Sequence, residues 1–141
     1  MREILFRGKR NDNGGWIEGV PIKTHIGTFI VFEENPHYCS QYGYMEIDKL
    51  AMVDPETIGQ WTGLVDKNGV KIFEGDIVES VFNKRKYIMC YGDFTYEDAD
   101  ENIQDVYGWF NLDEDGFSTL FGCPEEWAIV TGNIHDKAVE E

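Results

Sequence analysis

One short acidic segment of this 141-residue chain has residue types and a spacing that could hold a metal ion. Asn111, Asp113 and Asp115 place oxygen atoms at every second position and a glycine follows, as in the first half of a calcium-binding loop. The twelfth position of such a loop normally holds a bidentate glutamate, and here it is Gly122. We therefore interpret the segment as a solvated hairpin turn, and we predict no metal ion and no cofactor for the chain.

The cysteines and histidines form no recognisable zinc or nucleophile site. His37 and Cys39 are the only closely spaced pair, whereas structural zinc sites usually combine two such pairs. The three cysteines are odd in number and include no CxxC motif, which predicts reduced thiols in a cytoplasmic protein. Nothing singles out one thiol as a nucleophile, so we expect no catalytic residue and no enzyme. A small metal-dependent hydrolase stays open as an alternative, because 27 acidic residues could include a working carboxylate pair.

A dense run of acidic residues is the strongest charge feature. Residues 93–126 hold eleven acids and no Lys or Arg, and aromatic residues interrupt the run, which favours an ordered segment. Such a surface could imitate the phosphates of DNA, or it could simply keep a sheet edge soluble. The acids that form this candidate interaction surface are Asp93, Glu97, Asp98, Asp100, Glu101, Asp105, Asp113, Glu114 and Asp115.

The overall charge excludes several classes of partner. With 12 basic and 27 acidic residues the net charge is −15, so we expect no direct binding of nucleic acid and no attraction to an anionic membrane. The basic trio 84–86 is too short to change this expectation. No apolar stretch approaches the roughly 20 residues of a membrane-spanning helix. The first ten residues also lack the apolar region of a signal peptide.

The elements that must position these side chains are predominantly β-strands. β-branched and aromatic residues far outnumber Ala, Leu and Met, and 15 glycines supply turns. We predict a mainly β protein of bent and coiled antiparallel sheets, or a small barrel-like sandwich, with at most one or two short helical turns. The expected strands are 4–7, 16–21, 25–32, 62–65, 70–73, 77–82, 87–91, 107–112, 117–121 and 127–131.

Turn signals separate these strands. Asn68-Gly69 between two apolar runs predicts a hairpin, and Asp54-Pro55 predicts the start of a short helical turn. We expect residues 33–45 to form an irregular loop. The chain is interpreted as a single domain over residues 1–141, which could be subdivided into lobes 1–50 and 51–136 with a frayed tail at 137–141.

The central segment closely resembles the hallmark of the YopX family of phage and prophage proteins. The resemblance covers residues 60–69 (QWTGLVDKNG) and 72–78 (IFEGDIV), and it extends to the flanking segments 1–7, 54–59 and 131–134. It implies a mostly β fold with strongly bent, coiled sheets. It supplies no activity and no catalytic residue that could be transferred to this chain.

These observations favour a non-enzymatic accessory protein of a phage or prophage. We expect it to act through a protein partner, and self-association into a homo-oligomer is consistent with exposed sheet edges. Mimicry of nucleic acid is the first alternative, because the acids are concentrated in one half of the chain. The metal-dependent hydrolase is the second.

Overall fold

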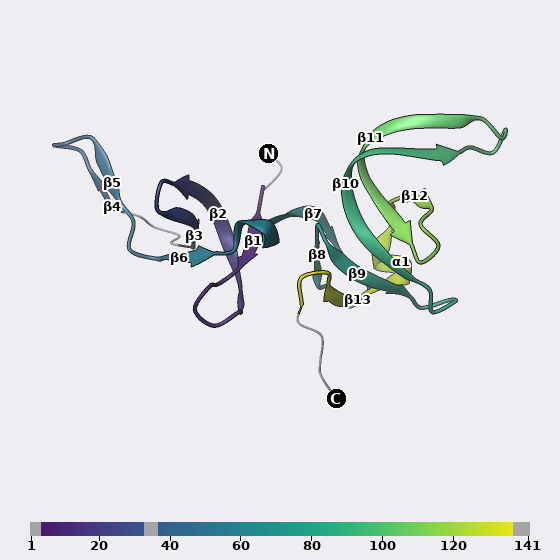
Figure 1. Cartoon of the computed structure of the whole chain (residues 1–141), viewed down its shortest axis with the longest axis horizontal. Helices are drawn as coiled ribbons and strands as arrows, with labels where there is room; N and C mark the ends of the chain where they lie inside the picture. Colours follow the sequence, from purple (N-terminus) through teal and green to yellow (C-terminus); the bar gives the residue numbers. More distant parts are fainter. Residues whose placement is uncertain (1–3, 33–36, 137–141) are drawn as a thin grey trace. The chain divides into compact units, whose positions relative to one another are not determined.

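The computed structural model describes residues 4–32 and 37–136, which form antiparallel β-strands with two short helical turns (Figure 1). This confirms the predicted mainly β class, and none of the described sheets closes into a barrel. The strands are β1 (Phe6–Lys9), β2 (Trp16–Thr24), β3 (Gly27–Val31), β4 (His37–Cys39), β5 (Tyr44–Glu46), β6 (Leu50–Val53), β7 (Gly59–Val65), β8 (Lys71–Phe73), β9 (Asp76–Ser80), β10 (Lys86–Glu97), β11 (Ile103–Asp113), β12 (Ser118–Leu120) and β13 (Ala128–Asn133). The helical turns are η1 (Pro55–Thr57) and α1 (Pro124–Trp127).

The chain divides into two compact units, residues 1–60 and 61–141. The division falls ten residues beyond the optional boundary at residue 50, because β6 pairs with β3 and therefore belongs to the first unit. The tail at 137–141 lies outside the described residues.

The first unit is a curved sheet in the order β6-β3-β2-β1, and the first two residues of β7 pair with β1. The strands predicted at 4–7 and 16–21 are present as β1 and β2, which pair with each other and place Arg7 opposite Glu18. The predicted helical turn is also present, and the Asp54 carboxylate accepts the Glu56 N–H at 3.1 Å. Ile30 and Val53 are buried on one face of this sheet.

The second unit contains a five-stranded sheet in the order β12-β11-β10-β9-β13. Its core consists of Ile72, Val78, Met89 and Ala128, all fully buried. Tyr87 and Trp127 pack against this cluster, and their rings meet edge to face with centroids 5.5 Å apart. The predicted Asn-Gly hairpin joins β7 to β8 beside this core.

The expectation of an irregular loop over residues 33–45 is wrong for the described part of that segment. Residues 33–36 lie outside the described residues, but β4 and β5 form a two-stranded hairpin further along. Its turn ends at Gly43, whose φ of 70° is the left-handed conformation that glycine adopts without strain. Tyr38 in β4 and Tyr44 in β5 give each of these short strands a residue of high β-propensity.

The strands expected at 87–91 and 107–112 are much longer than predicted. β10 and β11 pair without interruption from Tyr87–Asp113 to Glu97–Ile103. Gly92 resembles a strand terminator in the sequence, yet it lies directly opposite Gly108 inside the hairpin, and the two glycines have φ values of 149° and 156°. Paired glycines in this region let both strands bend at the same point without ending.

Candidate protein-interaction surface

The outer part of the β10–β11 hairpin extends beyond the rest of its sheet. β9 pairs only with Lys86–Ile88 of β10, and β12 pairs only with Phe110–Leu112 of β11. Residues 91–109 therefore pair only with each other among the described strands, and we call this segment the arm. Figure 1 shows it curving away from β9 and β13. The opposed glycines at 92 and 108 mark the bend at its base.

The Asp98 carboxylate organises the turn at the tip of the arm. Its Oδ1 atom accepts the backbone N–H groups of Asp100 and Asn102, each at 2.9 Å, and its Oδ2 atom accepts Gln104 Nε2 at 2.9 Å. The Asn102 N–H and the Gln104 amide lower the pKa of Asp98 because both donate hydrogen bonds to its ionised form. The tip acids are thus held by an ordered turn.

Among the described residues, the same turn occurs at three places. Asp66 and Asp113 each accept the N–H groups two and four residues later, just as Asp98 does. In those two turns the fourth residue is a glycine, whereas at the tip it is Glu101, with a φ of 63°. A side chain in this left-handed conformation costs about 1 kcal/mol relative to glycine.

Replacing Glu101 by glycine is expected to stabilise the tip of the arm by about 1 kcal/mol, because the left-handed strain disappears. Hydrogen exchange of the amides at 98–104 should slow by up to about fivefold. The control is Asp100→Gly, which also removes one tip acid. Asp100 is not in the left-handed conformation, so this replacement relieves no strain and should accelerate exchange. Equal exchange in Glu101→Gly and the wild type would show that the turn is not strained.

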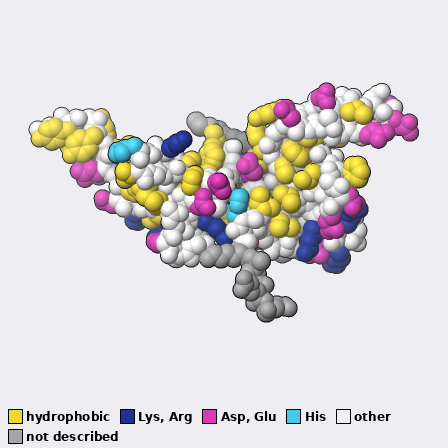
Figure 2. All heavy atoms as spheres, in the orientation of Figure 1, with side chains coloured by type: hydrophobic (Ala, Val, Ile, Leu, Met, Phe, Trp, Pro, Cys, Tyr) yellow, Lys and Arg dark blue, Asp and Glu magenta, His cyan; other side chains and the backbone are white. Residues whose placement is uncertain are grey.

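Three aromatic rings cover one face of the arm near its base. Tyr91 packs edge to face on Tyr107 and on Trp109, with centroids 5.4 Å and 4.8 Å apart. Two-thirds of the Tyr107 surface (66%) stays exposed, as does 47% of Tyr91. Hydrophobic and acidic side chains lie next to each other in this part of the chain (Figure 2). Exposed aromatic residues of this kind often supply the energy of protein interfaces.

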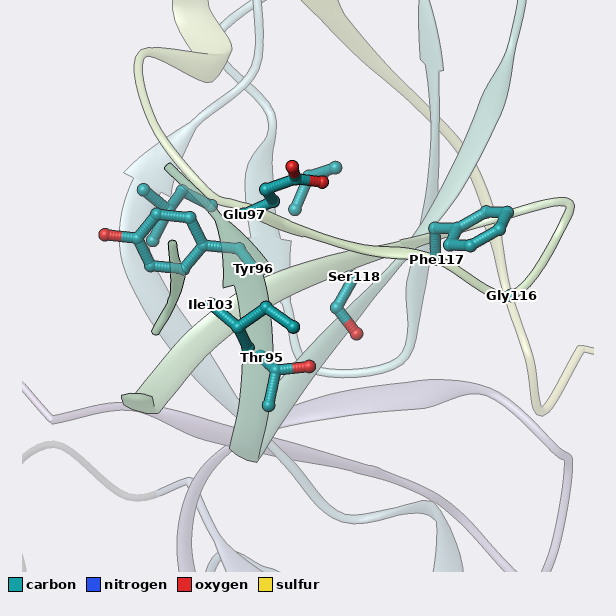
Figure 3. A pocket seen from close by; sticks show the side chains of 9 residues that line it. Thr95, Tyr96, Glu97, Ile103, Gly116, Phe117 and Ser118 are labelled. Carbon is teal, nitrogen blue, oxygen red and sulfur yellow. The ribbon is translucent and has the colours of Figure 1, made fainter. Parts of the chain in front are cut away.

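A groove lies between the arm and the segment Gly116–Leu120, which includes β12 (Figure 3). Its volume is about 610 Å³, and Tyr96, Ile103 and Phe117 give it apolar walls. Glu97 lines the same groove. A neighbouring hollow of about 640 Å³ shares the residues Thr95 and Ser118 and adds the carboxylates Asp93 and Asp105.

The structure separates the predicted acidic surface into two groups. Six of the acids lie on the arm: Asp93, Glu97, Asp98, Asp100, Glu101 and Asp105. The remaining three, at 113–115, lie in the β11–β12 turn, about 27 Å along β11 from the acid at 105. There Arg85 forms an ion pair with Asp115 at 2.9 Å, and the Lys86 N–H donates to Glu114 Oε1. Among the described residues no ion pair involves the six arm acids, so of the two groups only the arm acids are without an ion pair.

Two acids of the central motif have a role that the sequence interpretation missed. Asp66 and Asp76 are 2% and 1% exposed. Asp76 accepts the Phe73 N–H at 2.8 Å and Asn133 Nδ2 at 3.0 Å, and thereby connects two turns of the second unit. The available signal was the position of each acid beside a turn glycine, which is typical of carboxylates that cap backbone N–H groups.

The β4–β5 hairpin is a second exposed aromatic surface, in the first unit. Tyr38 and Tyr42 are 59% and 70% exposed, and the Tyr42 ring stacks on Tyr44 at 6.1 Å. Hydrophobic side chains cover this hairpin in Figure 2. Its strands contain one acid, Glu46, whereas the arm carries six, so the hairpin ranks second as an interaction surface.

The described residues contain no group of three His, Cys, Asp or Glu side chains placed to hold a metal ion. Burial raises the pKa of the Cys90 thiol, and nearby Glu74 raises it further, so this cysteine remains protonated at neutral pH. Burial likewise raises the pKa of Glu74. Within 4–32 and 37–136, the helical segments are all too short to cross a membrane.

Comparison with known proteins gives one match. The family model described as YopX protein matches residues 5–139, which is nearly the whole chain. Neither the curated proteins nor the solved structures include a match to the chain.

Proposed function

The chain belongs to the YopX protein family, and from that premise we propose that it is a non-enzymatic protein-interaction module that serves as an accessory protein of a phage or prophage. The arm is the proposed binding surface. Its partner is a protein, and the proposed setting is the bacterial cytoplasm.

The observation that carries the proposal is the combination of features on the arm. Exposed Tyr91 and Tyr107 offer large, rigid apolar surface, which interfaces favour because little side-chain entropy is lost on binding. The arm acids add charge that no described basic residue neutralises, and such charge steers a partner of opposite sign. The aromatic rings would then supply most of the binding affinity, and the acids would orient the partner as it approaches.

Mimicry of nucleic acid is a second candidate because the six arm acids are gathered on one narrow hairpin. On that account the acids carry the binding energy and the tyrosines only order the arm. Binding would then collapse as salt screens the charges, since the Debye length falls to about 3 Å at 1 M salt. Aromatic contacts persist under the same conditions.

A salt-graded pull-down with an arm variant tests the proposal. Tagged protein is incubated with bacterial lysate and washed at low and then high salt, and captured proteins are quantified by mass spectrometry. We expect the wild type to retain a partner in high salt. The double variant Tyr91→Ser/Tyr107→Ser should retain at least about tenfold less, since buried interface aromatics are each worth about 2 kcal/mol or more.

The matched control is Tyr38→Ser/Tyr42→Ser in the β4–β5 hairpin, which removes two tyrosines outside the arm that are somewhat more exposed than the arm pair. It should leave capture unchanged. Equal capture by the arm variant and the wild type would contradict the proposal. Capture of a DNA-handling protein only at low salt would instead support mimicry.

A further inference from the structure

We propose that the groove between the arm and β12 binds an extended, basic peptide segment of a partner protein, which adds as a strand to the free edge of β12. This inference rests on the proposed interaction function and specifies the chemistry of the partner. Its evidence comes from the strand edge, the groove walls and the groove charge.

β12 is an edge strand and also lines the groove. It is the terminal strand of its sheet, next to β11 alone. The Asp113 N–H donates to the Phe117 carbonyl oxygen at 3.0 Å, so the hydrogen-bonded pairs of this ladder are 113–117 and then 111–119. The backbone N–H groups of Ser118, which lies between those pairs, and of Leu120, which follows the second pair, therefore point away from β11. A peptide can pair with such an edge.

The groove can accommodate the side chains of an added strand. It runs beside five consecutive residues, Gly116–Leu120, and its opposite wall is the outer part of the arm (Figure 3). Side chains alternate between the two faces of a strand. One row of an added strand would meet Ile103 and Phe117, which are 75% and 69% exposed. Those contacts favour β-branched or other apolar residues at alternate positions.

The charge of the groove selects a basic segment. Glu97 lines the groove and Asp93 and Asp105 line its neighbouring hollow, while neither lining includes a lysine or an arginine. The acids would repel a nucleic acid. They would also oppose pairing of two β12 edges from two copies of this chain, because two acidic arms would then lie close together. A segment that alternates apolar residues with Lys or Arg can pack its apolar side chains on the groove walls and place its cations near the acids.

The test uses three synthetic hexapeptides with blocked ends and the full-length protein. The probe is the alternating peptide Lys-Val-Lys-Val-Lys-Val. The second peptide replaces each lysine by glutamate, and the third keeps the probe's side chains but carries N-methyl groups on all its backbone nitrogens, which block pairing along both of its edges. Binding is measured by two-dimensional ¹⁵N–¹H NMR at near-physiological salt.

We expect the probe to cause saturable shifts of the Ser118 and Leu120 amides, and the other two peptides to bind at least about tenfold more weakly. Glu97→Lys should weaken probe binding about fivefold, because a lining attraction becomes a repulsion. Asp100→Lys is the matched control: it makes the same charge change at the tip, outside the groove lining, and should alter binding less than twofold. Ser118→Pro should abolish the shifts, since proline is tolerated on an edge but has no N–H.

Three results would overturn the inference: no saturable shift at 118–120, equal binding of the three peptides, or concentration-dependent shifts of these amides without peptide, which would identify a second copy as the occupant. If Ser118→Pro fails to fold, the N-methylated peptide still decides whether backbone pairing occurs. The failure is distinguishable from failure of the proposed function. If the peptides do not bind but partner capture still depends on Tyr91 and Tyr107, the peptide-binding role of the groove is rejected and the proposed function of the arm is not.

Discussion

Replacing Asp66 by alanine is expected to lower the free energy of unfolding by about 4 kcal/mol. The carboxylate is almost fully buried and accepts three backbone N–H groups. Oδ1 accepts Asn68 at 2.8 Å and Val70 at 2.9 Å, and Oδ2 accepts Val130 at 2.9 Å. Alanine leaves all three donors without the acceptor, and hydrogen bonds to a charged group are the strong ones. Against a total stability of roughly 5–15 kcal/mol, this loss leaves little margin.

Urea unfolding of wild type and Asp66→Ala measures the effect, and Asp66→Asn refines it. The asparagine keeps one oxygen for the turn but sets an N–H₂ group against the Val130 N–H, so it should lose about half as much. The matched control is Asp98→Ala, which breaks the same turn at the exposed tip of the arm and should change stability only slightly. Similar midpoints for Asp66→Ala and the wild type would show that this motif residue is not structural.

Replacing Gly19 by alanine is expected to disrupt the sheet of the first unit. A Cβ atom at this position would overlap the Val31 carbonyl oxygen, and it would lie 2.8 Å from the Val31 carbonyl carbon and 2.9 Å from Ile30 Cγ2. Backbone cannot move aside as a flexible side chain can, so β2 and β3 must separate. We expect a loss of about 3 kcal/mol, at the upper end of the usual cost of overpacking.

Hydrogen exchange followed by mass spectrometry locates this loss. The amides of β2 and β3 should exchange faster in Gly19→Ala, while the core strands of the second unit keep their protection. Gly122→Ala is the control, since a Cβ there meets no atom within 4 Å and its φ lies outside the left-handed region. It should be neutral or slightly stabilising. Unchanged exchange in β2 and β3 would refute the close approach at Gly19.

Local signals predicted most of the fold, whereas pairing between distant residues decided the rest. Asn68-Gly69 and Asp54-Pro55 were interpreted correctly, because turn and cap chemistry depends on neighbouring residues only. The long arm was not predicted, because a glycine within a strand resembles a strand end until its partner is known. The role of Gly92 as a bend within a strand is evident only from its pairing with Gly108, which lies sixteen residues away in the sequence.

The candidate site shows the same limit. The acids of residues 93–115 form one run in the sequence, but the length of β11 places Asp105 and Asp115 at opposite ends of a hairpin. Arg85, thirty residues before Asp115, neutralises only the second group. The burial of Asp66 depends on Val130, which lies 64 residues away, and neighbouring residues could not indicate that contact.

The most direct test of the central claim, that the arm is the surface through which this YopX-family protein binds its partner, is site-specific photo-crosslinking in bacterial cells. One variant carries p-benzoylphenylalanine in place of Tyr107 on the arm, and the other carries it in place of Tyr38 on β4. Both side chains are well exposed, so the two positions differ in location rather than accessibility. We predict a defined crosslinked protein from position 107 and none from position 38. The same partner crosslinked from position 38 alone, or no defined product from position 107, would contradict the account.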